Sequence, residues 1–209
     1  MSEQTDTPKE EIYYDQRSVA LRTAQSIYFV KEHDKATMLE LLLNDYKEKQ
    51  IVIVVKSKKK ADALSELLKS NEFNARAVHG NHRETQQQEA ATSFNAGTLH
   101  IIITTDMILK ILGLENIKLV ISHDLPDTPQ EYYNRLAFMK EMGVGMALVS
   151  PEDEYNLDEI EYNMKKEIDE KKVEGFVATD APMHTNKAKK DRTKKPRHRK
   201  NKVKNDTSI

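Results

Sequence analysis

Two short apolar runs of this sequence each end in side chains that could hold a ligand. Leu99–Ile103 is followed by Thr104–Asp106, and Leu119–Ile121 is followed by Ser122–Asp124. Apolar runs of this length, bounded by turn signals and alternating with helical segments, predict parallel strands that are covered on both faces. Ligands of such sheets bind outside the carboxyl ends of the strands. We therefore expect these two polar triplets to lie at the functional edge of the protein.

The surrounding segments alternate between strand and helix patterns. Thr128, Pro129 and Glu131 have the order of a helix start, with a capping residue, a proline at the first position and a carboxylate three residues after the cap. The pattern of a strand followed by a helix recurs about five times with short loops, which predicts an α/β fold, a doubly wound, mostly parallel β-sheet flanked by helices. The predicted strands are Ile27–Val30, Ile51–Val55, Ala75–Val78, Leu99–Ile103, Leu119–Ile121 and Gly145–Val149.

Charge divides this chain into an acidic part and a basic part. Residues 187–209 contain 11 Lys/Arg and 2 Asp/Glu, or +9, so the other residues, with 22 Lys/Arg and 32 Asp/Glu, carry −10 of the total of −1. We expect a flexible leader over residues 1–24 with a helical turn near Ser18–Leu21, one folded domain over 25–177 and a disordered Lys/Arg-rich tail over 178–209.

Composition also excludes several classes of site. The chain has no Cys, which excludes disulfides, thiolate metal sites and cysteine nucleophiles. No apolar run approaches the length of a membrane span, and the first residues lack the pattern of a signal peptide. We therefore expect a cytoplasmic protein that makes no contact with membranes.

Several short motifs follow one another in a characteristic order. The motifs are His79–Gly80, Phe94 with Gly97, the TTD that ends at Asp106, the HDLP that begins at His123, Tyr132–Arg135, and Val149 to Glu152 after the last strand. Together they resemble the second RecA-like domain of DEAD-box RNA helicases, over about Ile27 to Val173. The resemblance implies a RecA-like fold and RNA as a partner.

The sequence departs from the family where the family handles ATP. The family's arginine-rich motif implies cations near the γ-phosphate, but here only its first arginine, Arg135, remains, and Phe138 and Glu141 occupy the arginine-finger positions. Neither side chain can neutralise charge that develops on a transferred phosphoryl group. None of the six glycines begins a phosphate-binding GxxxxGK[ST] loop. We expect no ATP hydrolysis by this chain alone and no cofactor, with ATP bound only if a partner domain supplies that loop.

The resemblance also implies which residues touch the RNA backbone. The loop lysines, hydroxyls and exposed amides suit phosphate contacts that do not read sequence. These positions are Lys56, Ser57, Lys58, Gly80, Thr105 and Lys110, the last in place of an arginine. The alternative interpretation makes Lys56–Lys60 a solvated helix start and Thr105–Asp106 the cap of the next turn. His79, Asp106 and Arg135 are further positions of the helicase motifs.

The basic tail is predicted to bind RNA by counterion release, with a steep dependence on salt and little sequence preference, because it has no aromatic residue for stacking. Its candidate contacts are Lys189, Lys190, Arg192, Lys194, Lys195, Arg197, Arg199 and Lys200. A tail that serves solubility or folds back on the acidic domain is the alternative. No metal site is expected, since His79 and His82 have no third ligand at suitable spacing in the sequence.

Three functions remain open from the sequence. The first is a degenerate helicase C-terminal domain that binds RNA or ribonucleoprotein as an accessory module, with no ATPase activity of its own. The second is half of a split ATP-dependent RNA helicase, completed in trans by an ATP-binding domain. The third is a scaffold that docks another protein, such as an active helicase or a ribosomal component.

Overall fold

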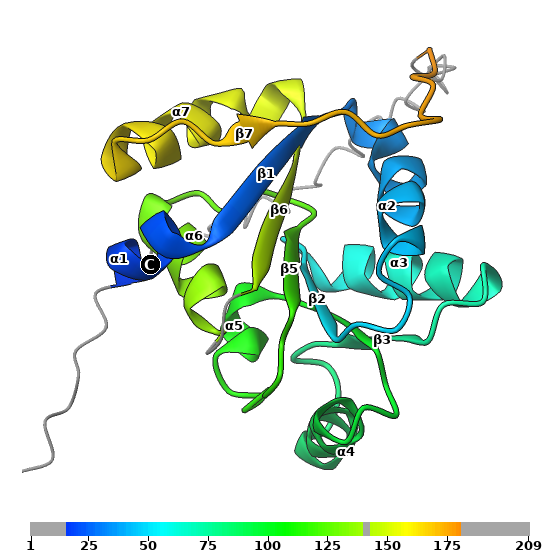
Figure 1. Ribbon diagram of the computed structural model, residues 1–209. Coiled ribbons are helices and arrows are strands. Elements are labelled where there is room, and N and C mark those ends of the chain that lie inside the picture. The colour runs from blue at the N-terminus through cyan, green and yellow to red at the C-terminus, as the bar shows by residue number, and fades with distance from the viewer. Residues whose placement is uncertain (1–15, 140–142, 181–209) are drawn as a thin grey trace, which may run out of the picture. The chain divides into compact units, whose positions relative to one another are not determined.

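A seven-stranded sheet forms the centre of the computed structural model, which describes residues 16–139 and 143–180 (Figure 1). All of its pairings are parallel, and the strand order is β3-β4-β2-β5-β6-β1-β7. The doubly wound parallel sheet predicted from the sequence is confirmed. The strands are β1 (Ala24–Phe29), β2 (Ile51–Val54), β3 (Ala75–Val78), β4 (Ile101–Thr104), β5 (Leu119–Ser122), β6 (Val144–Val149) and β7 (Asp169–Glu170).

Helices cover both faces of the sheet, and their buried residues fall into two clusters. One cluster joins α1 (Gln16–Arg22), α4 (Glu84–Asn95), α5 (Asp106–Leu109), α6 (Pro129–Ala137) and α7 (Glu154–Met164) to one face. The other joins α2 (Lys35–Asn44) and α3 (Lys58–Ser70) to the opposite face. Two 3₁₀ turns, η1 (Glu32–Asp34) and η2 (Pro151–Asp153), precede α2 and α7.

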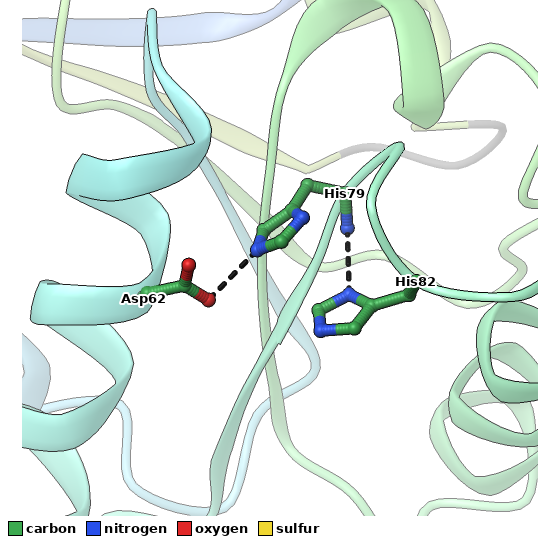
Figure 2. Close-up of side chains that lie close together, drawn as sticks. All are labelled: Asp62, His79 and His82. Carbon is green, nitrogen blue, oxygen red and sulfur yellow. Dashed lines mark hydrogen bonds and ion pairs between the residues drawn. The ribbon is translucent and has the colours of Figure 1, made fainter.

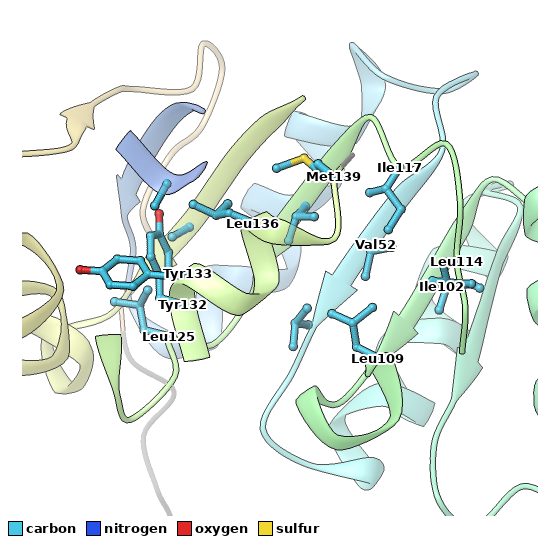
Figure 3. Close-up of a cluster of buried hydrophobic side chains, with 14 of the residues drawn as sticks. Val52, Ile102, Leu109, Leu114, Ile117, Leu125, Tyr132, Tyr133, Leu136 and Met139 are labelled. Carbon is cyan, nitrogen blue, oxygen red and sulfur yellow. The ribbon is translucent and has the colours of Figure 1, made fainter. Parts of the chain in front are cut away.

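The central strands β2, β4 and β5 are apolar except at Thr104 and Ser122, the last residues of β4 and β5, because both faces of the sheet are covered. All four residues of β2 and of β4 are buried, and their apolar residues alternate between the two clusters. Figure 3 shows Val52 of β2 and Ile102 of β4 beside Leu109 of α5 in the first cluster. The sheet is therefore rigid where the loops that follow β2, β4 and β5 begin.

The helix start predicted before α6 is present. The Thr128 side chain accepts a hydrogen bond from the backbone N–H of Glu131 at 3.3 Å, and Pro129 occupies the first turn. This cap fixes the direction in which α6 leaves the β5 loop. Arg135, in the last turn of α6, is thereby carried back toward that edge of the sheet.

Ordered contacts continue just outside the expected domain bounds of 25–177. The helical turn expected near Ser18–Leu21 is present as part of α1, whose Ala20 is fully buried against the core. At the other end, Thr179 donates hydrogen bonds to Asp34 from its hydroxyl at 2.5 Å and from its backbone N–H at 3.0 Å. The chain divides into two units, Met1–Thr179 and Asp180–Ile209, and the description concerns the first.

None of the helices among the described residues is long and apolar enough to cross a membrane.

Candidate nucleic-acid interface

An open pocket of about 580 Å³ lies at the carboxyl ends of β2 and β4. Five of the residues singled out from the sequence line it: Lys56, Lys58, Gly80, Thr105 and Asp106. They come from the loops after β2, β3 and β4, which are neighbours in the sheet although they are distant in sequence. The remaining lining residues are Val55, Met107, Ile108, Pro126, Asp127 and Glu131.

The two lysines of the pocket have different partners. Lys56 Nζ lies 2.7 Å from the Asp127 carboxylate, so its charge is already paired. Lys58 Nζ donates to the neutral side-chain oxygen of Asn81 at 2.8 Å. Lys58 therefore keeps a positive charge that an incoming anion can meet. Its Nζ lies 3.5 Å from the position that a Cβ on Gly80 would occupy, which is an ordinary van der Waals contact, so the Gly80 loop runs directly beside the ammonium.

Ser57 serves the fold. Its hydroxyl accepts a hydrogen bond from the backbone N–H of Lys60 at 3.2 Å and caps α3. This geometry supports the helix-start interpretation at Ser57. Thr105 stands at the corresponding position before α5, but its side chain makes no capping bond. The Thr105 hydroxyl therefore remains a candidate for ligand contact.

Arg135 is held within the domain by two loops. Its Nε and one terminal nitrogen donate to the two carboxylate oxygens of Asp106 at 2.6 and 2.7 Å, and its other terminal nitrogen donates to the backbone oxygen of Asp124 at 2.7 Å. The side chain is 1% exposed. A fork of this kind ties the β4 loop to the β5 loop. Arg135 therefore holds Asp106, which lines the pocket, in place.

The remaining predicted residues are dispersed or lie outside the described residues. Lys110 is exposed at the end of α5 and does not line the pocket. Phe138, at one arginine-finger position, packs against the first core cluster. Glu141, at the other, lies outside the described residues, as do all the candidate contacts of the tail from Lys189 to Lys200.

A network of charges that the sequence did not reveal supports the pocket. Asp124 accepts from the Lys60 ammonium at 2.7 Å and from the Lys56 backbone N–H at 2.9 Å, and Lys35 Nζ lies 3.6 Å away. Burial alone would raise the pKa of Asp124, but hydrogen bonds from His123, Lys60 and the Lys56 backbone outweigh it and hold that pKa far below its usual range. Asp124 therefore remains charged and fixes the start of the Lys56 loop.

Asp62, His79 and His82 lie close enough together beside the pocket that each could offer one ligand atom to a metal ion (Figure 2). Sequence spacing missed Asp62, which α3 supplies: His79 Nε2 lies 2.7 Å from its carboxylate. The two imidazole rings stack with centroids 4.1 Å apart and planes 23° from parallel. Burial, together with the charge of His79, lowers the pKa of His82.

The hydrogen bonds of this cluster differ from those of a metal site. Nδ1 of His82 faces the backbone N–H of His79 at 3.1 Å, and Nδ1 of His79 faces that of Asn81 at 3.4 Å. Both Nδ1 atoms are therefore acceptors, which puts the proton of each neutral ring on Nε2. Metal-binding histidines usually donate from the nitrogen that does not bind the metal, and one ion cannot lie in the planes of two stacked rings. A hydrogen-bonded His79–Asp62 pair fits this geometry, and the absence of a metal stays a prediction.

Comparison with known proteins identifies the domain. Residues 34–137 match the family model of the helicase conserved C-terminal domain. ATP-dependent RNA helicase SUB2-2 of Vanderwaltozyma polyspora is 31% identical over 174 residues, which are 81% of this chain and 39% of that protein. The chain contains a DEAD-box helicase C-terminal domain. Pre-mRNA-splicing ATP-dependent RNA helicase PRP28 of Pyricularia oryzae is 32% identical over 143 residues, 65% of this chain and 21% of that protein.

Solved structures agree with this helicase domain. A DEAD box protein from Methanococcus jannaschii superposes with a TM-score of 0.68 and 25% identity, covering 74% of this chain and 43% of that one. The Escherichia coli DEAD-box protein SrmB, solved bound to RraA, gives 0.69 and 17% identity over 76% of this chain and 98% of that one. The RecA-like fold expected from the motifs is confirmed. The chain spans about two fifths of the length of SUB2-2 and a fifth of PRP28.

Proposed function

We propose that this chain is an RNA-binding accessory module that holds RNA by its phosphate backbone and does not turn over ATP by itself. The observation that carries the proposal is the pocket that gathers Lys58, Gly80 and Thr105 at one edge of the sheet. A lysine with a neutral partner, a hydroxyl and a loop without a side chain suit a phosphate, and they contact no base edge. Relatives named ATP-dependent RNA helicases support RNA as the ligand class.

The basic tail supplies most of the affinity in this proposal. Its eleven cations between residues 187 and 204 attract any polyanion, with a strength that falls steeply as salt rises. The pocket adds a smaller contribution that depends on geometry, because Lys58 is its one cation without a carboxylate partner among the interactions described above. RNA binding should therefore have two separable parts.

Fluorescence anisotropy with a labelled single-stranded RNA tests both parts. The full chain is compared with a chain that ends at Asp180, which keeps the Thr179–Asp34 contact. Removing the tail should weaken binding and flatten its dependence on salt. Lys58→Gln should weaken the remaining binding, whereas Lys69→Gln, which removes the same charge from the last turn of the same helix, should leave it unchanged. Equal, negligible binding by the full and shortened chains would refute the proposal.

The proposed lack of ATP turnover rests on the arginine-finger positions. Phe138 contacts the core and carries no charge, and all three guanidinium nitrogens of the buried Arg135 side chain donate hydrogen bonds to Asp106 or Asp124. Without a cation at the transferred phosphate, a phosphoryl-transfer site loses a factor of about 10³–10⁵ in rate. The purified chain should show no RNA-stimulated phosphate release, and measurable turnover would overturn this part.

A split helicase is the second candidate. Met107 at the rim of the pocket is 76% exposed, and Ile111 after α5 is 68% exposed. Two apolar side chains open to solvent beside the pocket suit contact with another domain. Purification with bound partners followed by an RNA-stimulated ATPase assay decides this candidate, since only a complex that supplies a phosphate-binding loop should turn over ATP.

A further inference from the structure

The outer face of α7 presents two tyrosines to solvent. Tyr155 is 72% exposed and Tyr162 is 84% exposed. The two tyrosines are seven positions apart, about two helical turns, so both rings lie on the same stripe. The opposite face of α7 is buried in the core through Leu157, Ile160 and Met164. The tyrosines therefore contribute little to the fold of the domain.

Two carboxylates flank the tyrosines. Asp158 and Glu159 are exposed and lie midway between the two rings along the helix. At 100° per residue, the two carboxylates lie about 50° to either side of the stripe. Each carboxylate is therefore next to the space between the rings. The two tyrosine rings therefore have one carboxylate on either side of the stripe that they form.

The surface is hollowed beside Tyr162. An open hollow of about 510 Å³ is lined by Asp158, Glu161, Tyr162, Lys165, Lys166 and Glu167. The Glu161 carboxylate accepts a hydrogen bond from the backbone N–H of Ile168 at 2.7 Å, which fixes its position. A long side chain could enter this hollow alongside the Tyr162 ring and reach a carboxylate.

We propose that this face of α7, formed by Tyr155, Asp158, Glu159 and Tyr162, docks an arginine-rich polypeptide segment of a partner protein. Charge complementarity selects the occupant. A guanidinium stacks on an aromatic ring and pairs with a carboxylate through two parallel hydrogen bonds, whereas a nucleic acid backbone is repelled by the same carboxylates. Tyrosine, which this face supplies, and arginine, which the partner would supply, are among the residues that most often dominate binding energy at protein interfaces. This docking surface is independent of the proposed RNA pocket, which belongs to other elements.

Binding of a defined peptide to the full chain tests the proposal. The probe is a fluorescein-labelled peptide of four Arg-Gly repeats, with four Glu-Gly repeats as the opposite-charge control, measured by anisotropy at low salt. The double variant Tyr155→Ala/Tyr162→Ala should bind the arginine peptide about fivefold or more weakly, as expected for the loss of two exposed cation–π contacts. Asp158→Asn/Glu159→Gln should weaken binding and reduce its dependence on salt.

A matched variant separates a site from general attraction to an acidic protein. Glu66→Gln/Glu84→Gln removes the same charge from exposed positions of α3 and α4 and should bind within twofold of the wild type. Circular dichroism and thermal melting should show all three variants folded, since every changed side chain points outward. Unchanged binding by the tyrosine variant, or an equal loss in the matched variant, overturns the proposal. So does self-association that the tyrosine variant abolishes, because the face would then belong to a second copy.

Discussion

Lys35 and Lys60 both place an ammonium group near the Asp124 carboxylate, and Lys35→Met should lower the free energy of unfolding more than Lys60→Met. The Lys35 side chain is 1% exposed, and its ammonium lies 2.8 Å from the Asp153 carboxylate, 3.0 Å from that of Glu32 and 3.6 Å from that of Asp124. Met fills nearly the same volume, so the substitution removes the charge and leaves little cavity. The two buried carboxylates then lose a cation that water cannot replace.

The size of the loss in unfolding free energy depends on which partners the two carboxylates keep after the lysine is removed. Asp153 keeps the hydroxyl of Ser150 at 2.8 Å, and Asp124 keeps Lys60 at 2.7 Å. Removing one partner of a buried ion pair costs about 3–5 kcal/mol of unfolding free energy. Lys60→Met is the comparison: the Lys60 side chain is 34% exposed, so water can replace part of its contacts and the loss should be about 1 kcal/mol.

Urea unfolding followed by circular dichroism at pH 7 measures both free energies. A double-mutant cycle with Asp153→Asn isolates the Lys35–Asp153 contact, and the coupling should exceed about 1 kcal/mol, because the two groups share one buried network. If Lys35→Met and Lys60→Met cost the same, or if Lys35→Met is neutral, burial does not decide the energy of this network and the reasoning fails.

Three further predictions concern the stability of the same domain. Arg135→Met should cost about 3–5 kcal/mol in urea unfolding, and Arg135→Lys less, because lysine keeps the charge and loses the fork. Gly145→Ala should cost about 1–3 kcal/mol in the same assay, since a Cβ would lie 2.6 Å from Leu136 Cδ2 in the core. Burial would raise the pKa values of Asp124 and Asp153, but hydrogen bonds and lysines lower them below their unfolded values, so their stabilisation is present above about pH 4 and lost as pH falls. Thermal melting from pH 7 to pH 3 should show this loss, smaller in Asp124→Asn.

The sequence was sufficient to predict the sheet and where its loops converge. Apolar runs such as Ile51–Val55 report burial on both faces, and parallel strands bring their carboxyl ends to one edge whatever their order. That rule placed Thr104–Asp106 at this edge, whereas Lys58 and Gly80, which line the same pocket, were singled out because the sequence resembles the helicase family. Helix capping depends on residues that are close together in the sequence, which is why Thr128 and Glu131 could be identified without the structure.

Contacts between distant segments could not be predicted in this way. Asp62 and His79 are 17 residues apart, and Lys35 and Asp153 are 118 apart, so neither pair has a spacing that a motif or a helical period would reveal. Charged residues on helices usually face water, and Lys35 has the same local pattern as an exposed lysine. The sequence indicated a helical turn near Ser18–Leu21, but the burial of Ala20 against the core is a contact between distant segments that the local pattern does not show.

The packing of Phe138 bears on what a charged side chain at this position would do to the domain. The ring rests against the apolar core beside α6, so an arginine at this position would exchange that contact for a charge with no established partner in the domain. Phe138→Arg should therefore lower the free energy of unfolding, whatever it does to a bound nucleotide. The position is occupied by a side chain that serves the interior of the domain.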